Sequence, residues 1–383
     1  MSPLTPRERV LAVLDHHKPD RVPLAIGADL TTGIQEFAYR RLAAHLNIDA
    51  EYQPMYDWHE LGAPNPAEAV LRRLRSDVRG IHDRFPAATY ERNRSRPAGS
   101  PYVDDWGVGQ LEIEPGIFFP AIHPLQSANR LEDIQAHLWP DMRDPARYAH
   151  LYAEAGRLAE ENQYAIVGAP WLLSPLERAF QLQGMQAFLL NLVDAPDFAA
   201  ALLRQITDLC LQNLEHFLHA TGDRLDILIL ADDLGTQTSL LISPRAYRSL
   251  LKPLHAELIA RARELCRARV MFHSDGDVFP LLDDLVEIGV DILNPVQITG
   301  RMADLAQLKQ RYGRQLVFCG GIDTQRVLPL GSPAEVRAEV KRVIETLGAD
   351  GGYLLATVHT IPNETPPENI LAMVDAALEF GCF

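Results

Sequence analysis

The sequence has few cysteines, and none of them are paired in a way that would hold a metal or a disulfide framework. Its four cysteines, Cys210, Cys266, Cys319 and Cys382, are widely spaced and include no CxxC pair, so a thiolate zinc cluster and a disulfide-rich fold are both excluded. The sequence also lacks an excess of basic residues, because its formal net charge is −15. A nucleic-acid surface needs concentrated positive charge, so nucleic-acid binding is not expected.

Long apolar runs are absent as well. Residues 1–9 are polar and no apolar stretch follows them, so we expect no signal peptide. The longest apolar runs are interrupted by charges and are too short to cross a bilayer. These features predict a cytoplasmic protein that does not bind a membrane. Hydrophobic residues make up 47% of its 383 residues, which is enough for a large core.

Apolar segments bounded by turn residues alternate with helical patterns along most of the chain. The apolar segments lie at 22–27, 77–82, 163–168, 225–231, 268–273, 290–294, 315–319 and 351–355. The helical patterns lie at 34–46, 176–190, 195–220, 244–266, 278–287, 303–311 and 333–347. This alternation is typical of an α/β fold with a parallel sheet and right-handed crossovers. Eight such units predict a closed (β/α)8 barrel of the TIM type.

Two segments add to the barrel. Thr5-Pro-Arg-Glu8 is a capping box with proline at the first helical position, which predicts an N-terminal helix from about Pro6 to His16. Residues 90–128 are rich in glycine, proline and aromatic residues, and they predict a β-hairpin insertion over the barrel mouth. We therefore expect a single domain over residues 1–383, with its insertion at about 90–128.

Potential metal ligands follow the fifth apolar segment directly. His273 and Asp275 stand at its carboxyl end, and side chains two residues apart on an extended segment point the same way. In a (β/α)8 barrel, that end of the strands carries the active site. His359 follows the eighth segment and can meet the other two across the mouth. Two imidazoles and one carboxylate suit zinc or another divalent ion; the alternative is that both histidines donate hydrogen bonds to an anionic substrate.

Other polar residues lie near the ends of the predicted strands. Each has a structural alternative: Asp232 or Asp233 as a helix cap, Cys319 as a small buried side chain, and the aromatic residues as core. With these alternatives open, Cys319 is a further candidate metal ligand. The candidates for substrate binding are Tyr102, Trp171, Asn294 and Gln297. The acidic residues near these strand ends are Asp77, Asp232, Asp233 and Asp323.

Several segments resemble the uroporphyrinogen decarboxylase superfamily over nearly the whole chain. They are Gly168-Ala-Pro-Trp171, the block from Asp232 to Pro244 with Tyr247, the run from Gly289 to Gln297, Gly-Gly-Ile-Asp323, and His359 through Thr365-Pro-Pro-Glu-Asn369. The decarboxylases of this superfamily are (β/α)8 barrels that work without a cofactor. The resemblance assigns their key aspartate to Asp77 and their substrate-contacting histidine to His359. Their arginine-rich substrate clamp has no counterpart, because residues 24–33 contain no arginine.

The sequence is more similar to the methyltransferase branch of that superfamily. Members of this branch that resemble methylcobalamin:coenzyme M methyltransferases bind zinc through a His-x-Cys motif and a later cysteine. Here His273-x-Asp275 and His359 stand at those positions. Replacing two thiolates by a carboxylate and an imidazole makes a bound ion more Lewis-acidic. That change favours an ether or alcohol oxygen over a thiol.

The resemblance therefore implies a metal-dependent methyltransferase of the demethylating kind. A methyl group would pass from a methoxylated or methylated small molecule to a corrinoid carried by a partner protein. Asp232, Asp233 or Asp323 would act as catalytic residues that supply protons or orient the substrate. The alternatives are a cofactor-free decarboxylase that uses Asp77 with His359, and a non-catalytic subunit that binds a tetrapyrrole or a corrinoid protein. A homodimer is the oligomeric state that the resemblance suggests.

Overall fold

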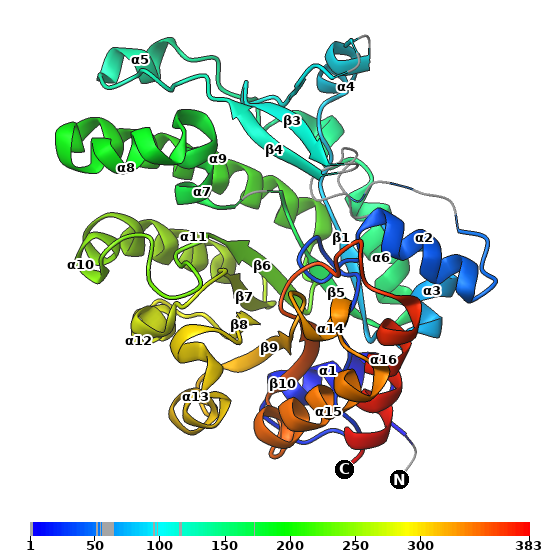
Figure 1. The fold of residues 1–383 in the computed structure, drawn as a ribbon. Coiled ribbons are helices and arrows are strands. Elements are labelled where there is room, and N and C mark those ends of the chain that lie inside the picture. The colour runs from blue at the N-terminus through cyan, green and yellow to red at the C-terminus, as the bar shows by residue number, and fades with distance from the viewer. Residues whose placement is uncertain are drawn as a thin grey trace.

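Seven parallel strands form a curled sheet at the centre of the chain. The computed structural model describes residues 3–50, 53, 55, 65–94, 96, 97, 99–114, 117–171 and 173–383. The strand order is β1-β5-β6-β7-β8-β9-β10, so each strand pairs with the strand of the next β/α unit (Figure 1). Their bounds are β1 Val78–Ile81, β5 Ala165–Gly168, β6 Ile227–Ala231, β7 Arg269–His273, β8 Ile292–Val296, β9 Val317–Ile322 and β10 Tyr353–Thr357.

An eighth extended segment closes the gap between the two edge strands. The Leu355 amide on β10 donates to the Pro23 carbonyl at 2.9 Å, and the Ala25 amide donates back to the Leu355 carbonyl at 2.9 Å. On the other side, the Asp77 amide next to β1 donates to the Leu24 carbonyl at 2.9 Å. Residues 23–25 thus occupy the position of the first barrel strand, and the predicted (β/α)8 barrel is confirmed.

Small and branched apolar side chains fill the barrel interior. They come from alternate positions on the strands, as the two-residue side-chain period of a strand requires. Helix α1 covers the amino-terminal end of the barrel with three side chains of its own, Val10, Val13 and Leu14. Its capping box is present as predicted, with Thr5 accepting from the Glu8 amide. The interior residues from the strands are Ala25, Ala28, Val78, Ala165, Val167, Ala169, Ile227, Ile229, Met271, Ile292, Val317, Cys319, Leu354 and Ala356.

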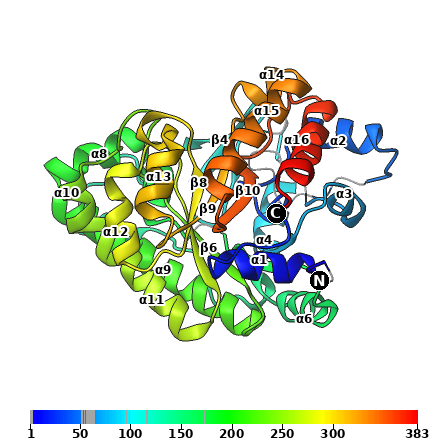
Figure 2. The ribbon, with the colours of Figure 1, turned by 90° about the horizontal axis from the view of Figure 1, so that it is seen from below.

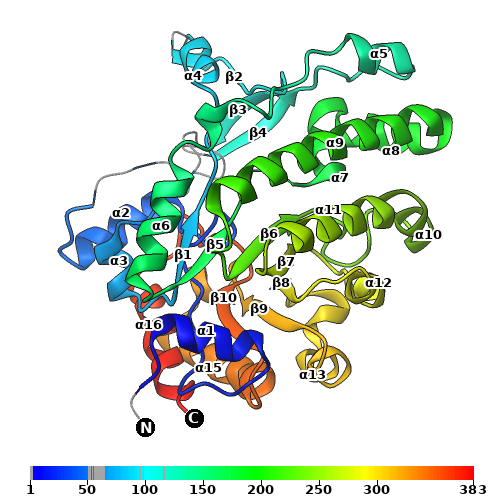
Figure 3. The same cartoon turned by 180° about the vertical axis from the view of Figure 1, so that it is seen from behind.

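Helices surround the sheet, and α1 lies near the viewer when the molecule is seen from below (Figure 2). The helices that follow the strands lie on its outer side, as the view from behind also shows (Figure 3). Two predicted helices each contain a π-helical turn, η2 Tyr247–Leu251 and η5 Ile344–Gly348. No helix in the described part of the chain is long and apolar enough to span a membrane. The α-helices are α1 Pro6–Leu14, α2 Glu36–His45, α3 Glu68–Arg73, α4 Ala87–Arg94, α5 Leu131–Ala136, α6 Leu151–Glu161, α7 Pro175–Gln183, α8 Met185–Asp194, α9 Pro196–Thr221, α10 Pro244–Ala246, α11 Lys252–Leu265, α12 Leu282–Glu287, α13 Leu305–Tyr312, α14 Val327–Leu330, α15 Pro333–Val343 and α16 Pro367–Phe380, and the short 3-10 turns are η1 Pro145–Arg147, η3 Phe279–Leu281 and η4 Gly300–Ala303.

The predicted insertion forms a separate three-stranded antiparallel sheet of order β2-β3-β4, with bounds Tyr102–Val103, Gly109–Glu114 and Ile117–Ile122. It lies on the side of the barrel opposite α1 (Figure 1). A buried ion pair fixes it to the barrel, because Arg178 on α7 contacts Asp104 at 3.1 Å and both side chains are almost fully buried. The hairpin therefore has a fixed place next to the carboxyl ends of the strands, as the sequence predicts.

Candidate active site

A cavity of about 700 Å³ opens at the carboxyl ends of the barrel strands. Its floor comes from the barrel and its walls come from the hairpin and from helices α7 and α8. Apolar side chains dominate the walls, and polar groups are concentrated at the strand ends. This combination is typical of a small-molecule site. The charged and imidazole side chains that line it are Asp29, His123, Glu177, Asp233, His273, Asp275 and His359, and the larger apolar ones are Leu30, Phe118, Phe119, Trp171, Leu173, Phe180, Met185, Ile229 and Leu241.

Three of these side chains come together as potential metal ligands. His273, Asp275 and His359 each offer a ligand atom, and these atoms all lie within 4.8 Å of one another. His273 Nε2 lies 3.9 Å from Asp275 Oδ1, and the two imidazole centroids are 5.7 Å apart. His273 is the last residue of β7, and His359 follows β10 by two residues. The barrel thus brings together two segments that are far apart in the sequence.

Hydrogen bonds behind these side chains set the direction in which they point. His273 Nδ1 lies 2.6 Å from Asn294 Oδ1. Because an amide oxygen can only accept, Nδ1 carries the proton and Nε2 keeps its lone pair for an ion. The amide of Asp275 donates to Asp233 Oδ1 at 2.8 Å. Asp275 Oδ1 is buried and makes no hydrogen bond within the described residues. A divalent ion would satisfy this oxygen, so the three residues fit a metal.

Asn294 gives a first prediction for this site. We expect Asn294→Ala to lower the affinity for a divalent ion about tenfold to a hundredfold, because His273 loses the acceptor that fixes its tautomer and ring orientation. Asn294→Asp keeps an oxygen acceptor and should retain most of the affinity. Competition with a chromogenic chelator measures both. Equal affinities for Asn294→Ala and the wild type would contradict this role.

The charge around the site is strongly acidic. No lysine or arginine is among the described residues that line the cavity. Burial raises the pKa of Glu177 to about 7, and the carboxylates of Asp233 and Asp232 add to the effect. Burial also raises the pKa of Asp233. Burial works against the imidazolium of His273, but the carboxylates of Asp275 and Asp233 outweigh it and raise its pKa. A cation placed among these groups would be stabilised.

Comparisons with known proteins agree with the fold. A family model described as "Uroporphyrinogen decarboxylase (URO-D)" matches residues 107–380. The chain belongs to the URO-D family.

Curated relatives and a solved structure extend this similarity. The chain is 23% identical over 290 residues to a uroporphyrinogen decarboxylase of Coxiella burnetii, covering 73% of this chain and 74% of that protein. It is 24% identical over 286 residues to the uroporphyrinogen decarboxylase of Alkalilimnicola ehrlichii, covering 71% and 72%. Among solved structures, a methyltransferase from Methanosarcina mazei covers 98% of this chain and 99% of its own, with a TM-score of 0.62 and 20% identity. That structure shares the fold.

In this URO-D family member, only one of the four predicted catalytic aspartates lines the cavity. That residue is Asp233. Its neighbour Asp232 is fully buried and accepts from the Leu176 amide at 2.9 Å, from the Glu177 amide at 2.8 Å and from His255 Nε2 at 2.9 Å. Asp232 therefore caps the start of α7, which precedes it in the sequence, and it affects the cavity through Glu177, which it positions and whose pKa its charge helps to raise.

Asp323 is also separated from the main cavity. Its Oδ1 accepts from the Gln325 amide at 2.7 Å. Together with the predicted substrate-binding residue Gln297, it lines a second cavity of about 270 Å³ next to β9. Asp323 and Gln297 thus lie near the barrel mouth but do not line the cavity that contains His273.

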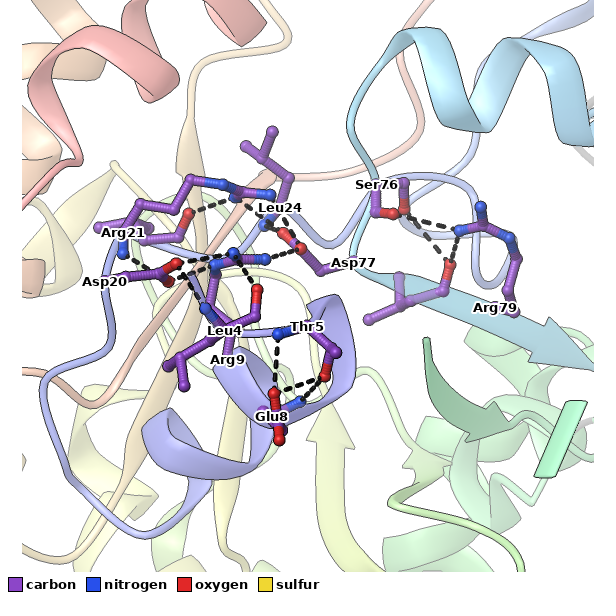
Figure 4. Close-up of polar contacts among 12 residues, drawn as sticks. Leu4, Thr5, Glu8, Arg9, Asp20, Arg21, Leu24, Ser76, Asp77 and Arg79 are labelled. Atoms are coloured by element: carbon purple, nitrogen blue, oxygen red, sulfur yellow. Dashed lines mark hydrogen bonds and ion pairs between the residues drawn. The ribbon is translucent and has the colours of Figure 1, made fainter. Parts of the chain in front are cut away.

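Asp77 lies at the wrong end of the barrel for catalysis, and this corrects the prediction. It immediately precedes β1, so it is at the amino end of the strands. Its carboxylate is fully buried among Arg9 Nη1 at 2.6 Å, Arg21 Nη1 and Nη2 at 2.9 Å and the Leu24 amide at 2.7 Å (Figure 4). The resemblance placed Asp77 in the active site because the residues around it match a segment of the family. The direction of β1 instead puts Asp77 at the end of the barrel away from the cavity.

The other candidates divide in the same way. Trp171 lines the cavity, whereas Asn294 lies behind His273. Tyr102 packs with Met55 and Phe85 in a small cluster that Trp171 also contacts, so it supports the wall from behind. Cys319 is buried in the barrel interior, and burial raises the pKa of its thiol to about 12. It is not part of the described group of metal ligands, in line with its reading as a small buried side chain.

The structure also shows acidic residues that the sequence prediction missed. Asp29 and Glu177 line the cavity. Asp83 lies at the mouth end of β1, where its Oδ1 accepts from the Trp171 amide at 2.6 Å and burial raises its pKa to about 6. A signal for Asp83 was present, because it directly follows the apolar segment 77–82. Glu177 had none, since it stands inside a helical pattern.

Proposed function

We propose that this chain is a metal-dependent methyltransferase of the demethylating kind. A methyl group on oxygen or another heteroatom of a small molecule would pass to the cobalt of a corrinoid that a partner protein carries. The observation that carries this proposal is the group His273, Asp275 and His359, whose ligand atoms lie within 4.8 Å of one another at the floor of a largely apolar cavity.

The donor set favours chemistry at oxygen. His273, Asp275 and His359 would hold zinc or another divalent ion and leave a position open for the substrate. Such an ion would supply a Lewis acid to the departing heteroatom. The chain's own residues would orient the substrate between Trp171 and the hairpin side chains Phe118 and Phe119. The apolar walls would exclude water from the reacting carbon.

The leaving group also needs a proton. When the methyl group moves to cobalt, the electron pair of the broken bond stays on the heteroatom, which is then protonated. Of the three aspartates predicted for this role, Asp233 is the one that lines the cavity. We therefore assign the role to Asp233, which is held next to Asp275 because its Oδ1 accepts a hydrogen bond from the Asp275 amide at 2.8 Å.

Decarboxylation is the second candidate, and the curated names of the relatives favour it. The acidic charge of the cavity lining argues against decarboxylation of a porphyrinogen. A porphyrinogen carries many carboxylates, and proteins hold such groups with arginine or lysine. The described lining contains neither residue, and it contains the four carboxyl groups of Asp29, Glu177, Asp233 and Asp275.

Methyl transfer can be tested directly. We expect the purified protein to contain a divalent metal and to convert cob(I)alamin into methylcob(III)alamin when it is given a methoxylated aromatic compound, as followed by visible absorbance. Removal of the metal by a chelator should stop the reaction, and adding it back should restore the rate. A metal-free preparation that stays fully active would refute the proposal. Decarboxylation of uroporphyrinogen, seen by product chromatography, would favour the second candidate.

A further inference from the structure

Helix α7 presents two polar side chains to the cavity that the proposed reaction does not use. Glu177 and Gln181 are one helical turn apart, and both line the cavity. Gln181 Nε2 donates to Glu177 Oε1 at 3.2 Å. Gln181 is 5% exposed, and its Oε1 atom is buried with no hydrogen-bond partner within the described residues. Gln181 therefore positions the Glu177 carboxyl, and Glu177 is the member of the pair that a ligand in the cavity can reach.

The charge at this place indicates what kind of donor fits. Glu177 is partly buried at the cavity wall, and burial together with Asp233 and Asp232 raises its pKa to about 7. Arg178 and His273 offset this effect only in part, and the described cavity lining contains no lysine or arginine that could serve as its counter-ion. A positively charged donor from a ligand would stabilise the Glu177 carboxylate. A carboxylate on the ligand would meet four acidic side chains.

Aromatic rings line the same cavity. Phe118 and Phe119 come from the hairpin and Phe180 comes from α7 itself. The faces of aromatic rings attract organic cations, most strongly where water is excluded. A carboxylate and aromatic rings together are suited to an ammonium group.

We propose that the Glu177–Gln181 face of α7 is a subsite for the ammonium group of the substrate, so that the substrate is a protonated amine carrying the methylated heteroatom. This inference rests on the proposed function in taking the cavity as the substrate site. It concerns binding, however, which can be measured without methyl transfer.

Three ring-matched probes test the subsite on the metal-loaded protein. They are 3,4-dimethoxybenzylamine, the corresponding benzyl alcohol and 3,4-dimethoxybenzoate, with affinities measured by titration calorimetry. We expect the amine to bind about tenfold to a hundredfold more tightly than the alcohol, since hydrogen bonds to a charged group are stronger. The benzoate should bind most weakly. Equal or tighter binding of the alcohol, or no binding of any probe at millimolar concentration, would overturn the inference.

Two substitutions on α7 test whether the preference for the amine arises at Glu177 and Gln181. Glu177→Gln should remove the advantage of the amine and leave the affinity for the alcohol nearly unchanged. Gln181→Leu, which keeps the Glu177 carboxyl, should lower the affinity for the amine several-fold. The matched control is Glu160→Gln on the exposed face of α6, which should keep the ratio. An amine preference that survives in Glu177→Gln rejects the subsite. Intact amine selectivity without methyl transfer would reject the proposed function alone.

Discussion

His273→Ala should empty the metal site and reduce methyl transfer by about a thousandfold or more. In the proposed function the imidazole would supply one of three protein ligands, and the 2.6 Å hydrogen bond between Nδ1 and Asn294 would direct its Nε2 to the ion. Two remaining ligands from Asp275 and His359 cannot hold a divalent ion firmly. A Lewis acid contributes several kcal/mol to the transition state, and about 4 kcal/mol corresponds to a thousandfold in rate.

Elemental analysis and the corrinoid assay measure the two effects separately. His359→Ala should behave like His273→Ala, because it removes a ligand from the opposite side of the same group. His219→Ala is the matched control, since His219 is an exposed residue of α9, and it should keep both metal and activity. If His273→Ala bound one equivalent of metal and worked at the wild-type rate, the three residues would not be a catalytic metal centre. Its histidines would then be the hydrogen-bond donors of the alternative interpretation.

The sequence predicted the barrel because each strand is a short apolar run between turn residues. The predicted strand 268–273 is β7 at Arg269–His273, and the predicted strand 351–355 overlaps β10 at Tyr353–Thr357. The first predicted segment, 22–27, joins the sheet without forming a regular strand, since residues 23–25 make only a few backbone hydrogen bonds to β10 and to Asp77. Such apolar runs in the sequence indicate which residues are buried, and burial decides where the strands lie in a parallel barrel.

The site could be predicted only in part, because strand patterns do not show which way each side chain points. Asp232 and Asp233 are adjacent, yet one caps α7 in the protein interior and the other faces the cavity. Glu177 reaches the cavity because α7 lies along its wall, and the helical pattern of 176–190 contains no information about that contact. His273, Asp275 and His359 were recognisable because they directly follow strands at the end where parallel barrels bind ligands.

Asp77 shows that the role of a residue depends on which end of a strand it lies at. It precedes β1, whereas Asp83 follows it, so only Asp83 lies on the side of the cavity. The partners of Asp77 come from the N-terminal extension, with Arg9 on α1 and Arg21 after it. Arg9 also contacts Asp20 at 2.7 Å. This buried cluster joins α1 to the amino end of the barrel (Figure 4), a structural role that local sequence could not reveal.

Asp77→Ala should therefore destabilise the fold strongly and leave the metal site intact. The substitution leaves Arg9 and Arg21 near a buried position without their shared acceptor, and breaking such a buried pair costs about 3–5 kcal/mol. We expect the urea midpoint of unfolding to fall clearly, while the folded fraction binds one metal ion as the wild type does. Asp141→Ala, which removes an exposed ion pair with Arg143, should leave the midpoint unchanged. If Asp77→Ala kept full stability and lost activity, Asp77 would again be a catalytic residue. A purely structural carboxylate cannot be removed from a buried cluster of arginines without loss of stability.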